Sequence, residues 1–297
     1  MTRRLHLVDV FTDRPCRGNQ LAVVTGAAGL TVRQMQAFAN EMNFSATTFV
    51  TSEQPADGGW PVRIFTPRRE LAAGGHSTLG TAHVLRHALL GGRVDRVTLA
   101  LEAGLVPVFV ERGGSGEKYW MRQRHPTFGA RVPRKAVAPA LGLSPADLDS
   151  HPIEEVSTGV AYLVVAVRTR QALERIRVDR AALLRLVDGL QAKAVIAFAP
   201  GAATAGHRLT SRVFFDFYDE PEDAASGSAN GCLAAWLVQH RFLEDDAIDL
   251  KVEQGFSIGR RSSLHLRAMR TSRGIEIRIG GGVADIAHGT IVAARFG

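Results

Sequence analysis

The feature that most constrains the fold is a weak internal repeat. The segment Ile64-Phe65 … Glu70-Leu-Ala-Ala-Gly-Gly75-His76-Ser77 resembles Phe214-Phe215 … Asp223-Ala-Ala-Ser-Gly227-Ser228-Ala229. Each segment has a strand-like pair, then an acidic residue, small residues, a glycine and a helix start. Gly75 and Gly227 stand 152 positions apart in a chain of 297, so the unit recurs after about half of the sequence. Such a duplication predicts two similar lobes whose repeated turns face each other.

Hydrophobic periodicity predicts mixed α/β structure in both halves. Strands are expected at 5–11, 21–24, 47–50, 62–65, 160–167, 195–198, 212–217, 275–279 and 289–293. Helices are expected at 77–90, 171–190 and 228–240, and residues 113–116 are expected at a hairpin tip. Thr31 and Gln34 form a capping-box pattern that opens a further helix, whose apolar face would be Val32, Met35, Phe38, Ala39 and Met42. One lobe is expected to comprise residues 1–121 plus 288–297, and the other residues 122–287.

Composition excludes several classes of protein. Hydrophobic residues make up 45% of the chain and charged residues 22%, as in ordinary globular proteins. No apolar run approaches the ~20 residues of a membrane span, and the first ten residues hold no signal-like apolar run. Cys16 and Cys232 cannot build a disulfide framework, so we expect a cytoplasmic protein that does not bind membranes.

The net charge of +7 raises the possibility of a nucleic-acid partner. Four of the 36 basic residues are lysine, and the arginines are scattered in clusters no longer than pairs such as Arg68-Arg69. Nucleic-acid tails carry longer basic runs, and aromatic residues do not interleave with these clusters. The charge pattern therefore predicts no nucleic-acid partner, although it suits an acidic small molecule.

Two glycine-rich turns predict an anion site. Gly74-Gly75-His76-Ser77-Thr78 and Gly227-Ser228-Ala229-Asn230-Gly231 each precede or open a helix. Glycine lets a ligand approach the backbone closely, and the free N–H groups of a first turn attract anions. Either turn alone is better explained as a tight structural turn. Paired across a duplication, they favour a small carboxylate bound in a cleft between the lobes.

Four polar residues near these turns are candidates for proton transfer. His76 at a helix start could act as acid or base near neutral pH, and Asp223 could act as a carboxylate base or orient the histidine. Asn19 is a candidate donor to a substrate oxygen, and Asp9 is a weaker candidate. Each also has a structural interpretation as a helix cap, a loop carboxylate or a turn residue.

Other chemistries lack their motifs. The sequence contains no Walker loop, no HExxH run, no CxxC pair and no nucleophile elbow around Ser228. Cys232, one residue past the second turn, is interpreted as a small buried residue rather than a nucleophile. We therefore expect no cofactor and no metal.

The chain resembles the PhzF-like family, named for an isomerase of phenazine biosynthesis. The resemblance covers essentially the whole chain and rests on Asp9-Val-Phe-Thr-Asp-Arg-Pro … Gly18-Asn19, Met35-Gln … Glu41-Met-Asn-Phe-Ser45, Arg63-Ile-Phe-Thr-Pro67 … Glu70-Leu … Gly75-His76, Glu222-Asp-Ala-Ala-Ser-Gly-Ser-Ala229, Gln254-Gly255 and Gly289-Thr-Ile291. It implies the diaminopimelate epimerase-like fold, an α/β (α+β) fold of two pseudo-symmetric lobes. Each lobe is a mixed sheet wrapped around a central helix.

The resemblance also implies site residues and an assembly. His76 and Asp223 would be catalytic, and the substrate would contact Asn19, Gly75, Ser77, Gly227 and Ser228. The two catalytic cysteines of the epimerase would fall near Gly75 and Gly227, and their absence argues against a two-thiol racemase. The implied assembly is a homodimer.

One position departs from the family pattern. The family run Met-Asn-x-Ser-Glu-Thr carries a glutamate that is thought to shuttle the proton, whereas this chain has Met42-Asn-Phe-Ser-Ala46-Thr47. A methyl group cannot carry a proton, so the ordinary mechanism is unavailable at Ala46.

Three functions remain open from the sequence. The leading one is an isomerase that moves a proton between carbons of a small unsaturated amino or imino acid, in specialised-metabolite or antibiotic biosynthesis. The second is a non-catalytic protein that binds a small carboxylate. The third is a different proton transfer, or a hydration or elimination, at the same site.

Overall fold

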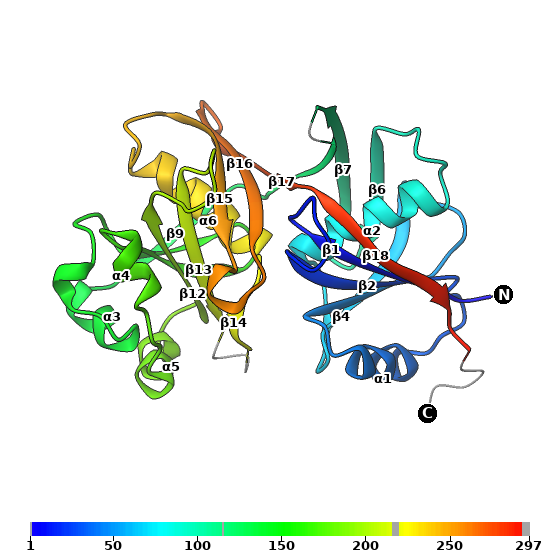
Figure 1. Ribbon diagram of the computed structural model, residues 1–297, viewed down its shortest axis with the longest axis horizontal. Helices are drawn as coiled ribbons and strands as arrows, with labels where there is room; N and C mark the ends of the chain where they lie inside the picture. The colour runs from blue at the N-terminus through cyan, green and yellow to red at the C-terminus, as the bar shows by residue number, and fades with distance from the viewer. Residues whose placement is uncertain (1, 115, 216–219, 293–297) are drawn as a thin grey trace. The chain divides into compact units, whose positions relative to one another are not determined.

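The computed structural model describes residues 2–114, 116–215 and 220–292 (Figure 1). The chain divides into two compact units. Unit 1 comprises Met1–Arg122 with Gly280–Gly297, and unit 2 comprises Gln123–Ile279. Within the described ranges, no helix is long and apolar enough to cross a membrane.

Unit 1 is a mixed sheet in which two parallel pairings alternate with antiparallel ones. β1 pairs antiparallel with β18 and with β2, β2 runs parallel to β3, and β3 is antiparallel to β4. β4 pairs with the short β5, runs parallel to β6, and the β6–β7–β8 meander follows. The bounds are β1 (Arg4–Val10), β2 (Asn19–Thr25), β3 (Ala46–Val50), β4 (Trp60–Phe65), β5 (Glu70–Leu71), β6 (Arg96–Leu101), β7 (Gly104–Gly113), β8 (Gly116–Arg122) and β18 (Val283–Thr290).

The core of unit 1 is the helix α2 (Gly75–Ala88). Ten consecutive residues, from Ser77 to Arg86, are buried, because the helix contacts β1, β2, β3, β6, β7, β8 and β18 around its circumference. Gly80 allows this fit, since a Cβ there would lie 2.5 Å from Leu21. Because the sheet encloses the body of α2, its N-terminus at Gly75 lies at one end of the enclosed segment.

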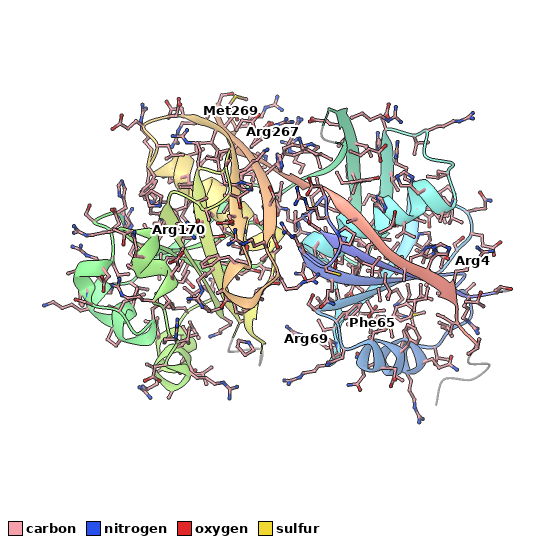
Figure 2. The ribbon with its side chains drawn as sticks, viewed as in Figure 1. Arg4, Phe65, Arg69, Arg170, Arg267 and Met269 are labelled. Atoms are coloured by element: carbon pink, nitrogen blue, oxygen red, sulfur yellow. The ribbon has the colours of Figure 1, made fainter. Side chains whose placement is uncertain are left out.

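The helix α1 (Val32–Met42) covers the outer face of the same sheet. Its capping box is formed as predicted, with the Thr31 and Gln34 side chains each bonded to the other's backbone. Phe38 of α1 meets Phe49 edge-on, and Phe49 meets Phe65 in the same way. Phe65 is labelled in Figure 2. Val32 is half exposed rather than buried, which corrects the predicted apolar face at its first residue.

Unit 2 repeats this strand order. β10 and β11 are antiparallel, β11 and β12 parallel, β12 and β13 antiparallel, and β13 pairs with the short β14 and runs parallel to β15. β9 and β16 pair antiparallel with β10 and β15. The bounds are β9 (Thr127–Arg131), β10 (Glu154–Ser157), β11 (Ala161–Ala166), β12 (Ala194–Pro200), β13 (Leu209–Phe215), β14 (Glu220–Asp223), β15 (Ala247–Gln254), β16 (Ser262–Thr271) and β17 (Gly274–Gly281).

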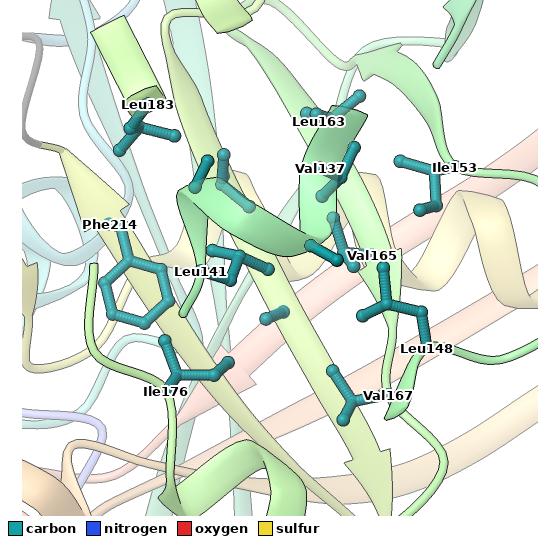
Figure 3. Close-up of a cluster of buried hydrophobic side chains, with 14 of the residues drawn as sticks. Val137, Leu141, Leu148, Ile153, Leu163, Val165, Val167, Ile176, Leu183 and Phe214 are labelled. Atoms are coloured by element: carbon teal, nitrogen blue, oxygen red, sulfur yellow. The ribbon is translucent and has the colours of Figure 1, made fainter. Parts of the chain in front are cut away.

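The sheet of unit 2 is apolar on both faces because helices cover both. The core helix α6 (Gly227–Gln239) is buried along most of its length, and its Trp236 meets Phe198 edge-on. Leu163 and Val165 point to the opposite face, against Val137 and Leu141 (Figure 3). The helices on that side are α3 (Arg134–Ala140), α4 (Arg170–Glu174) and α5 (Arg180–Asp188). Unit 2 also contains the 3₁₀ turns η1 (Pro145–Asp147) and η3 (Phe256–Ile258).

Two predicted elements are wrong in extent. The helix expected over 171–190 is two helices, because Asp179 caps α5 and the linker backbone bonds to α3 at Ala140 and Leu141. The last strand was expected at 289–293, but β18 begins at Val283 and ends at Thr290. The ends of two predicted strands, at residues 216–217 and 293, lie outside the described residues.

Candidate functional site

In unit 1 the predicted turn before α2 is a close-packed helix start. Gly74 is the N-cap and Gly75 the first helical residue. A Cβ on Gly74 would lie 2.2 Å from Ser77 Oγ, so any larger residue at this position would displace the Ser77 hydroxyl. Ser77 Oγ is buried and has no hydrogen-bond partner, whereas Thr78 Oγ1 donates to the Gly74 carbonyl at 2.5 Å. The helix start therefore offers a buried hydroxyl beside the positive end of the helix dipole.

His76 lies in this turn and contacts two residues from other segments. Its Nδ1 is 3.5 Å from Asn19 Nδ2, and its Nε2 is 3.4 Å from Ser45 Oγ. Ser45 Oγ also donates to Asn19 Oδ1 at 2.8 Å. Desolvation by burial lowers the pKa of His76 to about 4, so the imidazole is neutral at neutral pH. The structure thus brings the predicted residues Asn19 and His76 together through Ser45.

Ser45 is the contact that the sequence reasoning did not assign to the site. It lies in the loop between α1 and β3, directly before Ala46. Its position in the sequence could have identified it. Ser45 directly precedes β3, which runs parallel to β2, and β2 begins at Asn19.

Ala46 opens β3 and pairs with Leu21 of β2. It is 2% exposed, and the next residue, Thr47, has a buried Oγ1 with no hydrogen-bond partner. Ala46 therefore contributes a buried methyl group next to the Asn19–Ser45–His76 cluster and no group that can transfer a proton.

Asp9, the weaker candidate, has a structural contact in unit 1. Its carboxylate accepts the backbone N–H of Cys16 at 2.7 Å. This bond spans the turn after β1, in which Cys16 adopts a left-handed conformation. Gly18 closes the turn at φ 69°, where a Cβ would lie 2.2 Å from the Val10 carbonyl oxygen. Asp9 and Gly18 thus shape the turn that presents Asn19.

In unit 2 the corresponding turn has a hydroxyl cluster. Ser226 caps α6 by accepting the backbone N–H of Ala229, and Gly227 is the first helical residue. Ser228 Oγ lies 2.7 Å from Tyr162 Oη, and Ser226 Oγ lies 3.4 Å from each of these two oxygens. Burial raises the pKa of Tyr162 well above its usual value, so it remains a neutral phenol. Tyr162 was not predicted, because nothing in its apolar strand marks it as polar.

Asp223 ends β14 and is partly exposed. Its Oδ1 accepts the backbone N–H of Ala225 at 3.3 Å, and its backbone carbonyl accepts Gln254 Nε2 at 2.8 Å. Gln254 Oε1 in turn accepts from the Ser226 backbone and from Asn230 Nδ2. Gln254 thus holds the whole turn from Asp223 to Asn230 in place and leaves the Asp223 carboxylate partly accessible.

The structure changes the residue alignment of the repeat. Arg63 donates to both carboxylate oxygens of Glu70, and Arg212 does the same to Glu222. Glu70 and Glu222 each stand five residues before the first residue of the core helix. The counterpart of Glu70 is therefore Glu222, and not Asp223 as the sequence comparison paired them. Asp223 has no acidic counterpart in unit 1, where Leu71 follows Glu70.

Cys232 is a buried residue and not a nucleophile. Cys232 is fully buried with its thiol near Thr158, and burial raises its pKa to about 12, which excludes a thiolate at neutral pH. Among the described residues, no group of three or more histidine, cysteine, aspartate or glutamate side chains could hold a metal ion.

Comparison with known proteins places the chain in a family. The family model described as "Phenazine biosynthesis-like protein" matches residues 8–289. The trans-2,3-dihydro-3-hydroxyanthranilate isomerase of Pseudomonas aeruginosa is 35% identical over 290 residues, covering 96% of this chain and 98% of that protein.

Two solved structures agree in fold. A PhzF-family phenazine biosynthesis protein of Bacillus anthracis is 27% identical with a TM-score of 0.89, covering 99% of this chain and all of that one. A predicted epimerase of P. aeruginosa is 33% identical with a TM-score of 0.82 and the same coverage. The predicted epimerase-like α/β fold is confirmed. The chain belongs to the phenazine biosynthesis-like family, and it is an enzyme of the isomerase class.

Proposed function

We propose that this isomerase moves a proton between carbons of a small unsaturated amino or imino carboxylate. The observation that carries the proposal is the neutral His76, held by Asn19 and Ser45 at the N-terminus of the buried helix α2. A relative with 35% identity isomerises trans-2,3-dihydro-3-hydroxyanthranilate, which is an unsaturated amino carboxylate. That compound is the first substrate to test.

The substrate carboxylate is proposed to bind at the N-terminus of a core helix. At α2 the first backbone N–H groups and the unpartnered Ser77 hydroxyl supply donors, and Gly74 leaves room for that hydroxyl. At α6 the same chemistry is available from Gly227 and from the hydroxyl of Ser228. These donors are neutral, so they favour a carboxylate without requiring a buried cation.

Asp223 is the proposed general base. The buried methyl group of Ala46 cannot accept a proton, whereas Asp223 is partly exposed and its carboxylate accepts the Ala225 backbone N–H. Proton abstraction next to an enamine or imine produces a conjugated and stabilised intermediate. One carboxylate base and a neutral hydrogen-bond donor therefore suffice for the chemistry. A role in specialised-metabolite biosynthesis is part of this proposal, since the relative's family is named for one such pathway.

The test is a hydrogen-exchange assay in D₂O. The purified chain is incubated with trans-2,3-dihydro-3-hydroxyanthranilate, and deuterium incorporation and double-bond position are followed by NMR. Enzyme-dependent incorporation at carbon together with a shifted double bond is expected. If the compound binds but neither exchanges nor isomerises, while structurally related dihydro and imino acids also remain unchanged, the chain is a carboxylate-binding protein.

A further inference from the structure

The contacts among Asn19, Ser45 and His76 form a closed ring of three hydrogen bonds. Ser45 Oγ lies 2.8 Å from Asn19 Oδ1, a distance typical of an O–H donor to a carbonyl oxygen. The single hydroxyl proton of Ser45 is used in this bond. The contact of Ser45 Oγ with His76 Nε2 at 3.4 Å can then form only if Nε2 carries the proton.

The third bond makes the same assignment from the same orientation of the Asn19 amide. Asn19 Nδ2 can only donate, and it lies 3.5 Å from His76 Nδ1. Nδ1 must therefore offer its lone pair. From these two contacts we infer that Asn19 and Ser45 are positioning residues that hold His76 as the neutral Nε2–H tautomer. His76 then serves the isomerase as a hydrogen-bond donor rather than as a base.

The tautomer assignment has a consequence for catalysis. The catalytic role of His76 rests on the proposed function. The Nδ1 lone pair faces an amide donor, so protonation there would require Asn19 to move away. The Nε2–H bond to Ser45 is long, since N–H donors normally lie about 2.9–3.0 Å from oxygen. A substrate oxygen or nitrogen can therefore compete with Ser45 for this proton. A neutral imidazole at a helix start that polarises a substrate is a known catalytic device.

The burial of Asn19 supports this assignment. Asn19 is 3% exposed, so its amide is shielded from water, and desolvation already lowers the pKa of His76 to about 4. Gly18 and Asp9 shape the turn that delivers Asn19, as described above. The unprotonated Nδ1 thus results from a structured loop and not from a mobile side chain.

The test is ¹⁵N NMR of the histidine side chains, which distinguishes a protonated from an unprotonated ring nitrogen directly. The chain has ten histidines, so the His76 signals are identified by their loss in His76→Gln. The expected wild-type signals are a protonated Nε2 and an unprotonated Nδ1 at pH 7. A protonated Nδ1 would mean that the Asn19 amide is turned over and that all three hydrogen bonds have the opposite donor and acceptor. This result would overturn the assignment.

Two matched variants separate positioning from mere packing. Asn19→Asp keeps the shape but replaces the donor with an acceptor, so Nδ1 should become protonated and the His76 pKa should rise by about 1–3 units. Ser45→Ala removes both the acceptor of Nε2–H and the donor to Asn19 Oδ1, but it leaves the Asn19 Nδ2 contact with Nδ1. The tautomer should therefore persist with a weaker hold on the ring. An Asn19→Asp variant whose His76 signals and titration match the wild type would overturn the role of Asn19.

Activity is measured on the same variants with trans-2,3-dihydro-3-hydroxyanthranilate. Asn19→Asp should lower kcat and shift the pH profile, whereas Ser45→Ala should alter kcat modestly without shifting it. If Asn19→Asp is protonated at His76 Nδ1 but its pH–activity profile is unshifted, His76 does not act as the hydrogen-bond donor. If no variant and no wild type turns over any substrate, the proposed function fails, while the NMR result still decides the tautomer.

Discussion

Arg212 and Glu222 form a buried bidentate ion pair that ties the turn before α6 to a distant helix end. The two N–O distances are 3.0 and 2.7 Å, and the side chains are 8% and 9% exposed. Arg212 also donates to the carbonyls of Leu173 and Ile176, at the end of α4. The equivalent pair in unit 1, Arg63 with Glu70, is 35% and 27% exposed. The same device is thus repeated in both units but is buried in one of them.

This difference predicts unequal costs of removal. Arg212→Met leaves the Glu222 carboxylate buried without its guanidinium, and breaking a buried pair costs about 3–5 kcal/mol. Arg63→Met removes a more exposed pair, which is worth about 0–1 kcal/mol. Urea denaturation of both variants measures the free energies of unfolding. Equal losses would show that burial of the pair is not the deciding factor.

Gly74→Ala should weaken carboxylate binding by displacing Ser77. The new Cβ would lie 2.2 Å from Ser77 Oγ, so the hydroxyl or the helix start must shift. The matched control is Gly74→Ala combined with Ser77→Ala, which removes the clashing oxygen. We expect the double variant to regain thermal stability but not affinity for the carboxylate, measured by calorimetry. Affinity restored in the double variant would mean that the Ser77 hydroxyl takes no part in binding.

Asp223→Asn should reduce turnover with little change in substrate affinity. The amide keeps the shape and can still accept from the Ala225 backbone, but it cannot act as a base. General-base catalysis contributes about 10²–10⁴-fold, so kcat should fall by that factor. Asp249→Asn, at a carboxylate that is 67% exposed, is the control. Full activity of Asp223→Asn on the true substrate would disprove the assignment of the base.

The depressed pKa of His76 predicts a loss of stability in acid. The unfolded chain protonates this histidine near pH 6.5, whereas the folded chain does so only near pH 4. The unfolded state therefore binds more protons between these values. The stabilisation is fully present above pH ~6.5 and is lost as the pH falls to ~4, a change of about 3 kcal/mol. Denaturation at pH 7.5 and 4.5 should show a smaller drop for His76→Gln than for the wild type. Equal drops would mean that His76 is not the group responsible.

The core helices, most strands and the capping box could be predicted from sequence because each depends on neighbouring residues. Apolar runs specify β1, β2 and β11, alternating in β1 and continuous in the other two, and Thr31 with Gln34 specifies the start of α1. Both kinds of signal act within a few residues. The glycine turns before α2 and α6 were equally visible in the sequence, because their glycines precede the apolar residues of each helix. The family resemblance extended this local information to the fold and to the isomerase class.

Only the tertiary structure decided which polar groups meet. Ser45 joins Asn19 and His76 because β2 and β3 run in parallel and α2 lies against both, a relationship between segments that are 26 to 57 residues apart. The pairing of Arg212 with Glu222, and with it the true alignment of the repeat, depends on the β13–β14 hairpin and the end of α4. The pKa of His76 depends on desolvation, which sequence spacing does not encode. The sequence alone determined the local structure and the family. The hydrogen-bond partners and protonation of the site residues came from long-range packing, which no local pattern specifies.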